Sequence, residues 1–289
     1  MIERYLIHYF LAVVDQGNFS RAAQQCGVSQ PTLSVGIAKL ETLVGHLLFQ
    51  RSNRRVELTG AGVKFADHAR QIEAQFARAE AALRSDKGRQ LIRIGIITSL
   101  PASWIGRAVR ETTVVEDEQL EIVEGRMRDL LPRLERGRID ALVGVTGHDP
   151  RARDIMFEEG YGLALPATHP LADRPVVDAG EVADAPMIVR RHCEALTDIS
   201  RHFTQRGVRP FFSARTTNDE RCIALVQAGL GITVMPHCFR QPGIAMPALH
   251  GFDQRRAIGF LVDPSARARI ERSRIYERFR DTLRQIARS

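Results

Sequence analysis

The chain contains 289 residues, of which 44% are hydrophobic and 26% are charged, a composition typical of soluble globular proteins. This length predicts two or three domains, and because the sequence contains no run of 18 apolar residues, we expect no membrane-spanning helix. The net charge of +7 favours a polyanionic partner, but eight arginines fall within residues 263–289, so overall charge does not by itself point to DNA.

The cysteines and the N-terminus indicate the compartment. Four cysteines lie far apart, without a CxxC pair: Cys26, Cys193, Cys222 and Cys238. This usage argues against a zinc module or a disulfide framework and predicts a reducing, cytoplasmic location. Residues 1–17 carry acidic groups and lack a small-residue cleavage site, so we expect an amphipathic helix rather than a signal peptide. Because motifs of hydrolases, zinc proteases, P-loop proteins and dinucleotide-binding enzymes are missing from the sequence, we expect neither enzyme activity nor a cofactor.

Three short helical patterns open the chain. Apolar residues at helical spacing predict a first helix over residues 3–16. Ser20 is expected to cap a second helix, Gly27 to form a turn, and Ser29 to cap a third helix with Pro31 in its first turn. The third helix directs Leu33, Ile37 and Leu40 toward a core. Two helices joined by a tight glycine turn predict a helix-turn-helix, whose second helix enters a DNA major groove. The alternative is an ordinary helical hairpin with a solvated face.

A predicted β-hairpin follows directly. The segment LLFQRSNRRVELT (47–59) has an apolar strand, a polar turn and a second strand, with Arg51, Arg54 and Arg55 around its tip. A charge run of this kind is usually a solvated loop. Its place directly after a helix-turn-helix instead favours the wing of a winged helix, which contacts the DNA backbone or minor groove.

A long helix is predicted beyond Thr59, because no proline occurs before Pro101. Apolar residues spaced alternately by four and three form a heptad seam along it, at Phe65, Ala69, Ile72, Phe76, Ala79 and Leu83. Such a seam predicts a partner helix and hence a dimer, and the alternative is packing against its own domain. The segment SDKG (85–88) is expected to end the helix.

The pattern becomes α/β beyond residue 90. Candidate strands occupy residues 91–97, 120–125, 139–145, 160–166 and 187–191, and a helix is predicted over 127–137. This alternation predicts a doubly wound sheet, in which ligands bind beyond the carboxyl ends of the strands. The residues that follow strands are Thr98, Ser99, Gly125, Arg126, Met127, Thr146, Arg190, Arg191 and Cys193, and Thr217 and Asn218 start a further segment.

Four motifs together resemble the LysR-type transcriptional regulators: FSRAAQQCGVSQPTLSVGIAKLE, LFQRSNRRVELTGAG, HPLA at 169–172 and VQAGLGITVMP at 226–236. They occur in the family's order and spacing, over residues 1 to about 262. The resemblance implies an α/β multidomain protein with a winged helix-turn-helix (1–59), a linker and dimerisation helix (60–88), and an effector domain (89–289). That domain is similar to type 2 periplasmic binding proteins, with lobe 1 over about 89–160 plus 263–289 and lobe 2 over about 161–262.

The resemblance and the residue pattern together give the candidate DNA contacts: Ser20, Arg21, Ser29, Gln30, Pro31, Thr32, Ser34, Val35, Lys39, Arg51, Asn53, Arg54 and Arg55. Val35-Gly36 departs from the family, which commonly has larger polar residues there. Gly36 is expected to weaken the helix by roughly 1 kcal/mol relative to alanine and to remove one DNA contact.

The same resemblance implies that the strand-end residues bind a small effector between the lobes, and their arginines favour an anionic one. The implied partners are double-stranded operator DNA, the effector and a second copy in a homodimer or homotetramer, with RNA polymerase a further candidate and no membrane. Cys193 follows two arginines and His192, a cationic setting that lowers a thiol pKa, so redox sensing is the alternative function. The last helix is expected to pack on lobe 1 through Ile270, Ile275, Phe279, Leu283 and Ile286.

Overall fold

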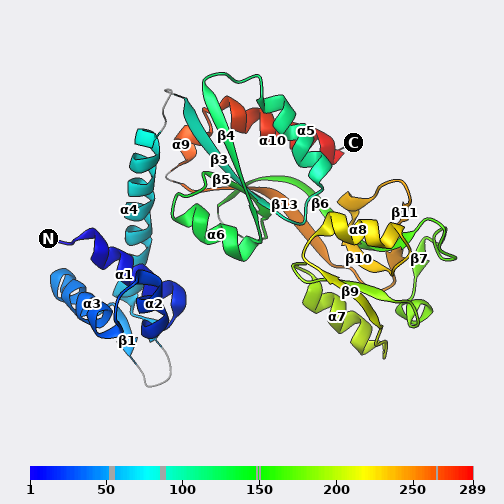
Figure 1. Ribbon diagram of the computed structural model, residues 1–289, viewed down its shortest axis with the longest axis horizontal. Coiled ribbons are helices and arrows are strands. Elements are labelled where there is room, and N and C mark those ends of the chain that lie inside the picture. Colours follow the sequence, from blue (N-terminus) through cyan, green and yellow to red (C-terminus); the bar gives the residue numbers. More distant parts are fainter. Residues whose placement is uncertain (52–55, 85–88, 148, 150, 265, 289) are drawn as a thin grey trace. The chain divides into compact units, whose positions relative to one another are not determined.

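The computed structural model describes residues 1–289 except 52–55, 85–88, 148, 150, 265 and 289 (Figure 1). The chain divides into two compact units, Met1–Asp86 with Glu135–Arg138, and Lys87–Leu134 with Ile139–Ser289. Within the described ranges, no helix has both the length and the apolar character needed to cross a bilayer.

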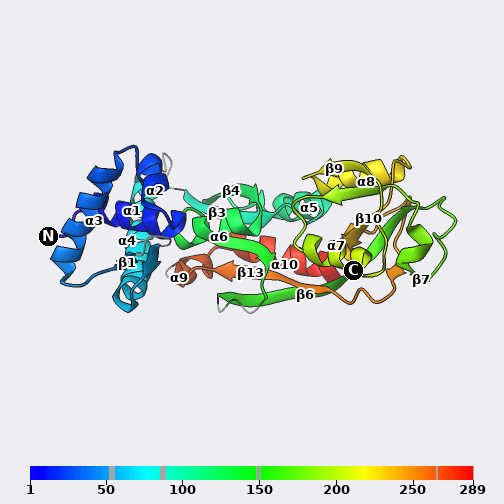
Figure 2. The ribbon, with the colours of Figure 1, turned by 90° about the horizontal axis from the view of Figure 1, so that it is seen from below.

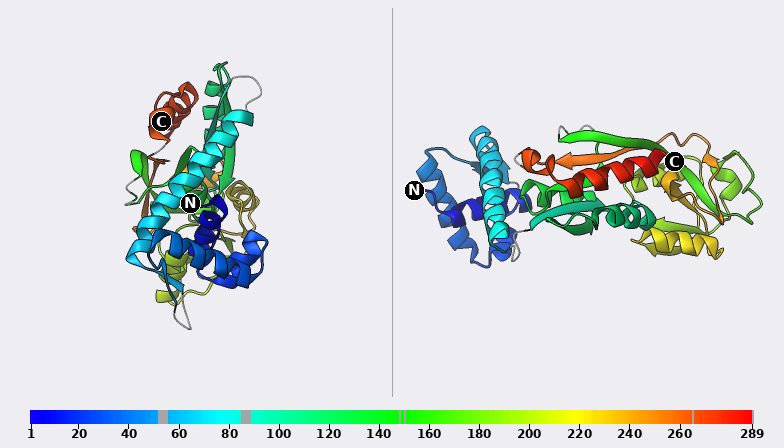
Figure 3. Two further views of the ribbon diagram at one scale, coloured as in Figure 1. Left: turned by 90° about the vertical axis from the view of Figure 1, so that its left-hand side faces the viewer. Right: turned by 90° about the horizontal axis from the view of Figure 1, so that it is seen from above.

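The first unit is a three-helix bundle with a two-stranded hairpin and a long helix (Figure 3, left). Its elements are α1 (Arg4–Gln16), α2 (Phe19–Cys26), α3 (Gln30–Val44), β1 (Phe49–Arg51), β2 (Val56–Leu58) and α4 (Gly60–Arg84). The core forms where the predicted apolar faces meet, with Phe10 of α1 and Leu33 and Ile37 of α3 fully buried. The ring of Phe10 also packs at 5.2 Å from that of Phe49 in the hairpin, so helices and hairpin share one core.

The helix ends agree with the sequence at one cap and correct another. The hydroxyl of Ser29 accepts a hydrogen bond from the Thr32 amide and caps α3, as predicted. The cap of α2 is Asn18 rather than Ser20, because the Asn18 carboxamide oxygen accepts from the Arg21 amide at 3.0 Å. Gly27 has a φ of 68°, the left-handed conformation that the tight turn between α2 and α3 requires.

The second unit begins with a lobe built on a mixed five-stranded sheet. In spatial order the strands are β4 (Glu118–Gly125), β3 (Gln90–Ile97), β5 (Ala141–Val145), β13 (Arg255–Val262) and the first part of β6 (Ala152–Pro166). β3 runs parallel to β4 and β5, whereas β13 is antiparallel to both β5 and β6. The expected doubly wound sheet is therefore present with an antiparallel strand in its interior.

Helices cover both faces of this sheet (Figures 1 and 3). They are α5 (Ala102–Thr112), α6 (Met127–Glu135), α9 (Arg267–Ile270) and α10 (Arg274–Arg288). The five apolar residues expected to dock the last helix are all buried, and the four from Ile270 to Leu283 belong to the core of this lobe, as predicted.

The second lobe surrounds the other half of β6. Its strands are β7 (Val176–Val177), β8 (Met187–Arg190), β9 (Phe212–Thr216), β10 (Thr233–Pro236), β11 (Ile244–Ala245) and β12 (Ala248–Leu249). Its helices are α7 (Leu196–Gln205) and α8 (Asp219–Gln227), with short 3₁₀ turns at Ala179–Val182 and His237–Phe239. β10, β11 and β12 pair with β6, and β8 runs parallel to β9.

The strand β6 runs from the first lobe into the second, and the chain returns to the first lobe at β13 (Figure 2). β6 pairs with β13 over residues 152–160 and with β10 over 161–164, so a single strand serves both sheets. The expected lobe boundary at residue 262 placed β13 in the second lobe. The structure places Ile258, Phe260 and Leu261 in the first-lobe core, because the chain returns to the first sheet at Arg255.

Candidate functional site

The N-terminus of α3 presents a row of exposed side chains. Gln30, Pro31 and Thr32 are exposed and Ser34 is half-buried, while Val35 retains 69% of its accessible surface. The Gln30 amide donates to the Ser34 hydroxyl at 2.9 Å, which orders the row. Short polar groups and an exposed apolar side chain at a helix N-terminus suit contact with base edges and phosphates in a major groove.

Charged groups flank this row unequally. Ser20 and Arg21 are exposed on α2, and the Arg21 side chain makes no ion pair with any described residue. Lys39 donates to Glu3 at 2.7 Å and to the Tyr5 hydroxyl at 3.1 Å, so its positive charge is already compensated. Asn53, Arg54 and Arg55 of the predicted wing, and the side chain of Arg51, lie outside the described residues. The strands on either side pair antiparallel, with Phe49 opposite Leu58.

Gly36 has a packing role that the sequence did not show. It is buried, and a Cβ at this position would lie 2.7 Å from Cδ2 of Tyr9 on α1. The residue faces the core rather than solvent, so the expectation that glycine removes a DNA contact here is wrong. The close approach of α1 to α3 explains why glycine is present within a helix.

The predicted dimerisation seam divides between two environments. Ala69 is fully buried and Phe65 packs at 5.0 Å from Phe10, so this end of the seam belongs to the core of its own unit. Ile72 and Phe76 remain 39% and 42% exposed, and Ala79 is also exposed. The side chain of Leu83 and the expected helix end at 85–88 lie outside the described residues. Among the described seam residues, the exposed apolar ones that a partner could cover therefore lie in the middle of α4.

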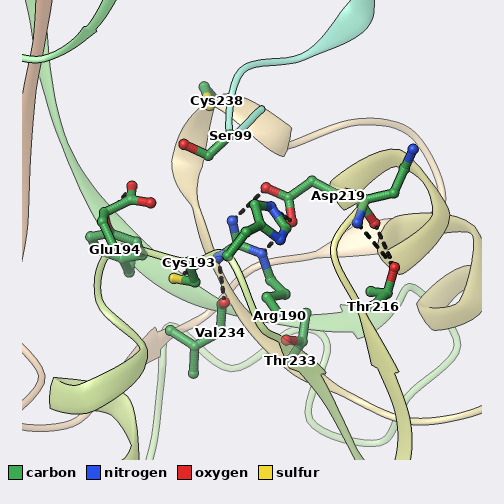
Figure 4. A network of polar contacts seen from close by, with 12 residues as sticks. Ser99, Arg190, Cys193, Glu194, Thr216, Asp219, Thr233, Val234 and Cys238 are labelled. Atoms are coloured by element: carbon green, nitrogen blue, oxygen red, sulfur yellow. Dashed lines mark hydrogen bonds and ion pairs between the residues drawn. The ribbon is translucent and has the colours of Figure 1, made fainter. Parts of the chain in front are cut away.

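Arg190 does not present a free charge to a ligand. Its side chain is 2% exposed, and its guanidinium donates to both carboxylate oxygens of Asp219 at 2.6 and 2.5 Å (Figure 4). Burial alone would raise the pKa of the Asp219 carboxyl, but the Arg190 charge outweighs it and lowers that pKa to about 2. The expectation that Arg190 holds an anionic effector is corrected by this pairing, because its charge is neutralised within the protein.

Cys193 follows β8 and lies beside this ion pair (Figure 4). The Arg190 Nη1 group donates to its Sγ at 3.2 Å. The thiol is buried, and burial raises its pKa despite the opposing Arg190 charge. The predicted lowering of the thiol pKa is therefore wrong, because desolvation penalises the thiolate more than one shared guanidinium favours it.

Arg256, at the start of β13, was missed by the sequence analysis. Its buried guanidinium donates to Glu159 of β6 at 2.7 Å, to Glu194 of the second lobe at 2.5 Å and to the Ser99 hydroxyl of the first lobe at 2.9 Å. The Tyr161 hydroxyl also donates to Glu194, at 2.9 Å. Ser99 is thus buried and engaged rather than open to a ligand. The signal in the sequence was a pair of arginines, Arg255 and Arg256, at the start of an apolar strand.

A cavity of about 390 Å³ lies between the two lobes. Thr98, Thr217 and Asn218 line it, together with Glu124 and Glu220 and the apolar ends of β3 and α5. The structure thus brings together three of the predicted effector residues. Asn218 also caps α8 by accepting from the Arg221 amide at 2.8 Å.

The other predicted effector residues do not line this cavity. Arg126 is paired with Asp129, the Thr146 hydroxyl donates to the Ala257 carbonyl, and Gly125 and Met127 pack against their own lobe. The Ala102 amide at the start of α5 donates to Glu220 at 2.8 Å. The arginine-based reason for an anionic effector therefore does not apply to this cavity.

Comparisons with known proteins place these features in a family. Residues 5–63 match the profile described as bacterial regulatory helix-turn-helix protein, lysR family, and residues 85–288 match the LysR substrate binding domain. The HTH-type transcriptional regulator AlsR of Bacillus subtilis is 32% identical over 80% of this chain and 79% of its own. A probable hydrogen peroxide-inducible genes activator of Mycobacterium avium is 33% identical over 78% of this chain and 75% of its own.

Solved structures share the fold. A full-length OxyR variant from Pseudomonas aeruginosa superimposes with a TM-score of 0.53 at 22% identity and covers 98% of both chains. Full-length BenM gives a TM-score of 0.51 at 24% identity and covers 99% of this chain and 96% of its own. Since the substrate-domain profile alone matches more than half of the chain, the protein belongs to the LysR family of bacterial helix-turn-helix regulators.

Proposed function

We propose that the protein is a transcriptional regulator that binds double-stranded operator DNA through α3 and the wing, and whose DNA binding or bending is switched by a small effector between the lobes. The observation that carries the proposal is the exposed polar row at the N-terminus of α3 in a chain that also holds a two-lobed domain with an interlobe cavity. It acts by binding rather than catalysis, in the cytoplasm, as a homodimer or homotetramer, with RNA polymerase a further partner.

The hydrogen bonds of Arg256 suggest how effector binding is coupled to movement of the lobes. One guanidinium contacts Ser99 of the first lobe and Glu194 of the second, so a movement of one lobe against the other must rearrange these bonds. An effector shifts the equilibrium between lobe positions only if it binds one of them more tightly. In an oligomer, the changed packing alters the spacing of the DNA-binding units and hence the bend of the operator.

The lining of the interlobe cavity indicates the class of effector. Its charged groups are all acidic, Glu124, Asp219 and Glu220, of which Asp219 is paired with Arg190. Its polar groups are the hydroxyls of Thr98 and Thr217 and the carboxamide of Asn218. These groups favour a ligand that offers hydroxyl or amino groups over one that offers a carboxylate. A thermal-melting screen of the full chain should give shifts with polyols or amines, and these shifts should shrink in Thr217→Val.

DNA binding is tested with a charge on the exposed face of α3. Val35→Asp should weaken binding to the upstream promoter by at least about tenfold, because the carboxylate faces phosphates, while the core is untouched. Val114→Asp is the matched control, the same change at a residue that is 60% exposed in the other unit. Fluorescence anisotropy at two salt concentrations measures both. Equal affinities for the two variants would contradict the assignment of α3 as the recognition helix.

Redox sensing through Cys193 is the second candidate. Relatives that bear the name hydrogen peroxide-inducible genes activator favour it, together with the contact between Arg190 and the thiol. The raised pKa of the buried thiol disfavours it, because the thiolate is the reacting species. If peroxide changes operator binding of the protein and leaves Cys193→Ser unaffected, the redox function replaces the effector-switched one.

A further inference from the structure

A cavity that the proposed function does not use lies within the second lobe. It measures about 640 Å³ and is enclosed by one face of α7, by β8 and β9, and by the connection at Arg209–Pro210. Leu196, Ile199 and Phe203 recur at helical spacing and form the α7 wall, opposite Val189 and Phe212. Its volume lies within the range of small-molecule sites, and its mostly apolar wall is typical of them.

The charges around this cavity are all of one sign. Arg191, Arg209 and Arg215 contribute to its lining, and none of the three side chains forms an ion pair or hydrogen bond with a described residue. Arg215 lies instead over the ring of Phe212, at 5.4 Å from its centroid. By contrast, Arg201 on the same helix α7 is paired with Asp198 at 2.9 Å. The cavity therefore combines an apolar wall with three guanidinium groups that have no counter-ion among the described side chains.

We propose that this cavity is a second ligand site, which binds a small organic carboxylate with an apolar body. The carboxylate accepts hydrogen bonds from the unpaired arginines, and the apolar body packs against the α7 wall. Guanidinium groups bind planar carboxylates through paired hydrogen bonds. The site should therefore prefer a carboxylate to a neutral amide or an alcohol.

Ligand binding in the second-lobe cavity can affect the interlobe cavity through the start of α8. Arg190 lines the second-lobe cavity and is bonded to Asp219, the first residue of α8. Thr217 and Asn218, directly before Asp219, line the interlobe cavity. A ligand that displaces Arg190 thus moves the start of α8 and with it two residues of the effector site. The two sites would then be coupled, and each ligand would change the affinity of the other by the same factor.

The test is isothermal titration calorimetry of the full chain with octanoate, and with octanamide as its uncharged counterpart. Octanoate is expected to bind at least about tenfold more tightly than octanamide, because the arginines supply charge-assisted hydrogen bonds. Arg191→Gln and Arg209→Gln should each weaken octanoate binding by about the same factor. Arg201→Gln is the matched control, since Arg201 is already paired and lies outside the cavity.

Several results would overturn the proposal. The proposal is wrong if octanoate does not bind at concentrations up to about 10 mM, or if octanamide binds as tightly as octanoate. It is also wrong if Arg191→Gln and Arg209→Gln both leave the octanoate affinity unchanged. Loss of binding in Thr217→Val alone would assign the octanoate to the interlobe cavity instead. Sedimentation velocity of the same variants measures whether the arginines instead hold the oligomer together. If Arg191→Gln or Arg209→Gln dissociates the oligomer without changing octanoate affinity, the arginines belong to a protein interface. None of these results bears on DNA binding, which Val35→Asp tests separately.

Discussion

Replacement of Asp219 by asparagine should be among the most damaging single changes in the second unit. The Arg190 and Asp219 side chains are 2% and 1% exposed, so the variant keeps the shape but leaves a guanidinium buried without its counter-ion. Breaking such a pair costs about 3–5 kcal/mol, a large part of the roughly 5–15 kcal/mol by which domains are stable. Urea unfolding measures the loss, followed by the fluorescence of Trp104, the single tryptophan, which packs in this unit.

Two controls separate the charge effect from a general effect of substitution. Asp198→Asn breaks a half-exposed pair with Arg201 and should cost no more than about 1 kcal/mol. The double variant Arg190→Met with Asp219→Leu removes both charges and should recover most of the lost stability, because well-packed apolar residues often replace buried pairs at little cost. A loss below about 1 kcal/mol in Asp219→Asn would refute the view that this pair holds the lobe together.

Two further outcomes follow from the pKa of Asp219 and from the exposed part of the α4 seam. The pKa of Asp219 is lowered to about 2 from 3.8, so its ionised form adds about 2 kcal/mol to the free energy of unfolding. This contribution is complete above pH 4 and is lost as the pH falls toward 2. The acid dependence of the stability of Asp219→Asn should lack this component. Phe76→Ser should weaken dimerisation at least about tenfold in sedimentation velocity, because the half-exposed ring can no longer be buried against the partner subunit. Val63→Ser is the control, since Val63 lies on the same helix but off the seam, and it should leave dimerisation unchanged.

Local sequence patterns predicted the fold better than they predicted the candidate effector site. Periodicity and capping residues placed α1 and the starts of α2, α3 and α4 within a residue or two, because each helix buries one apolar stripe of its own. The cap of α2 was misplaced because Asn18 and Ser20 are both good capping residues two positions apart, and only the backbone conformation distinguishes them. Five strands of the second unit were predicted in the same way: β3, β4, β5, the second part of β6, and β8. β7 and β9 to β13 were not predicted, and the antiparallel place of β13 depends on its distant partners.

The effector site depends on pairs that are remote in sequence. Arg190 meets Asp219 across 29 residues, and Arg256 meets Glu159 across 97, so neither neutralisation is visible in a local pattern. A charged residue after a strand therefore predicts its position near a cleft but not whether its charge is free. Similarly, the buried state of Cys193 reverses the pKa shift that its cationic neighbours in the sequence suggest.

The interior position of β13 also affects how the protein is made. β13 lies between β5 and β6 in the first sheet, yet more than a hundred residues of chain, including the whole second lobe, separate it from β5. A ribosome must therefore deliver the second lobe before the first can be completed, and until then the hydrogen-bonding edge of β5 stays unpaired. The second lobe is free to fold on its own stretch of nascent chain, while the first lobe, although it starts earlier, is finished last.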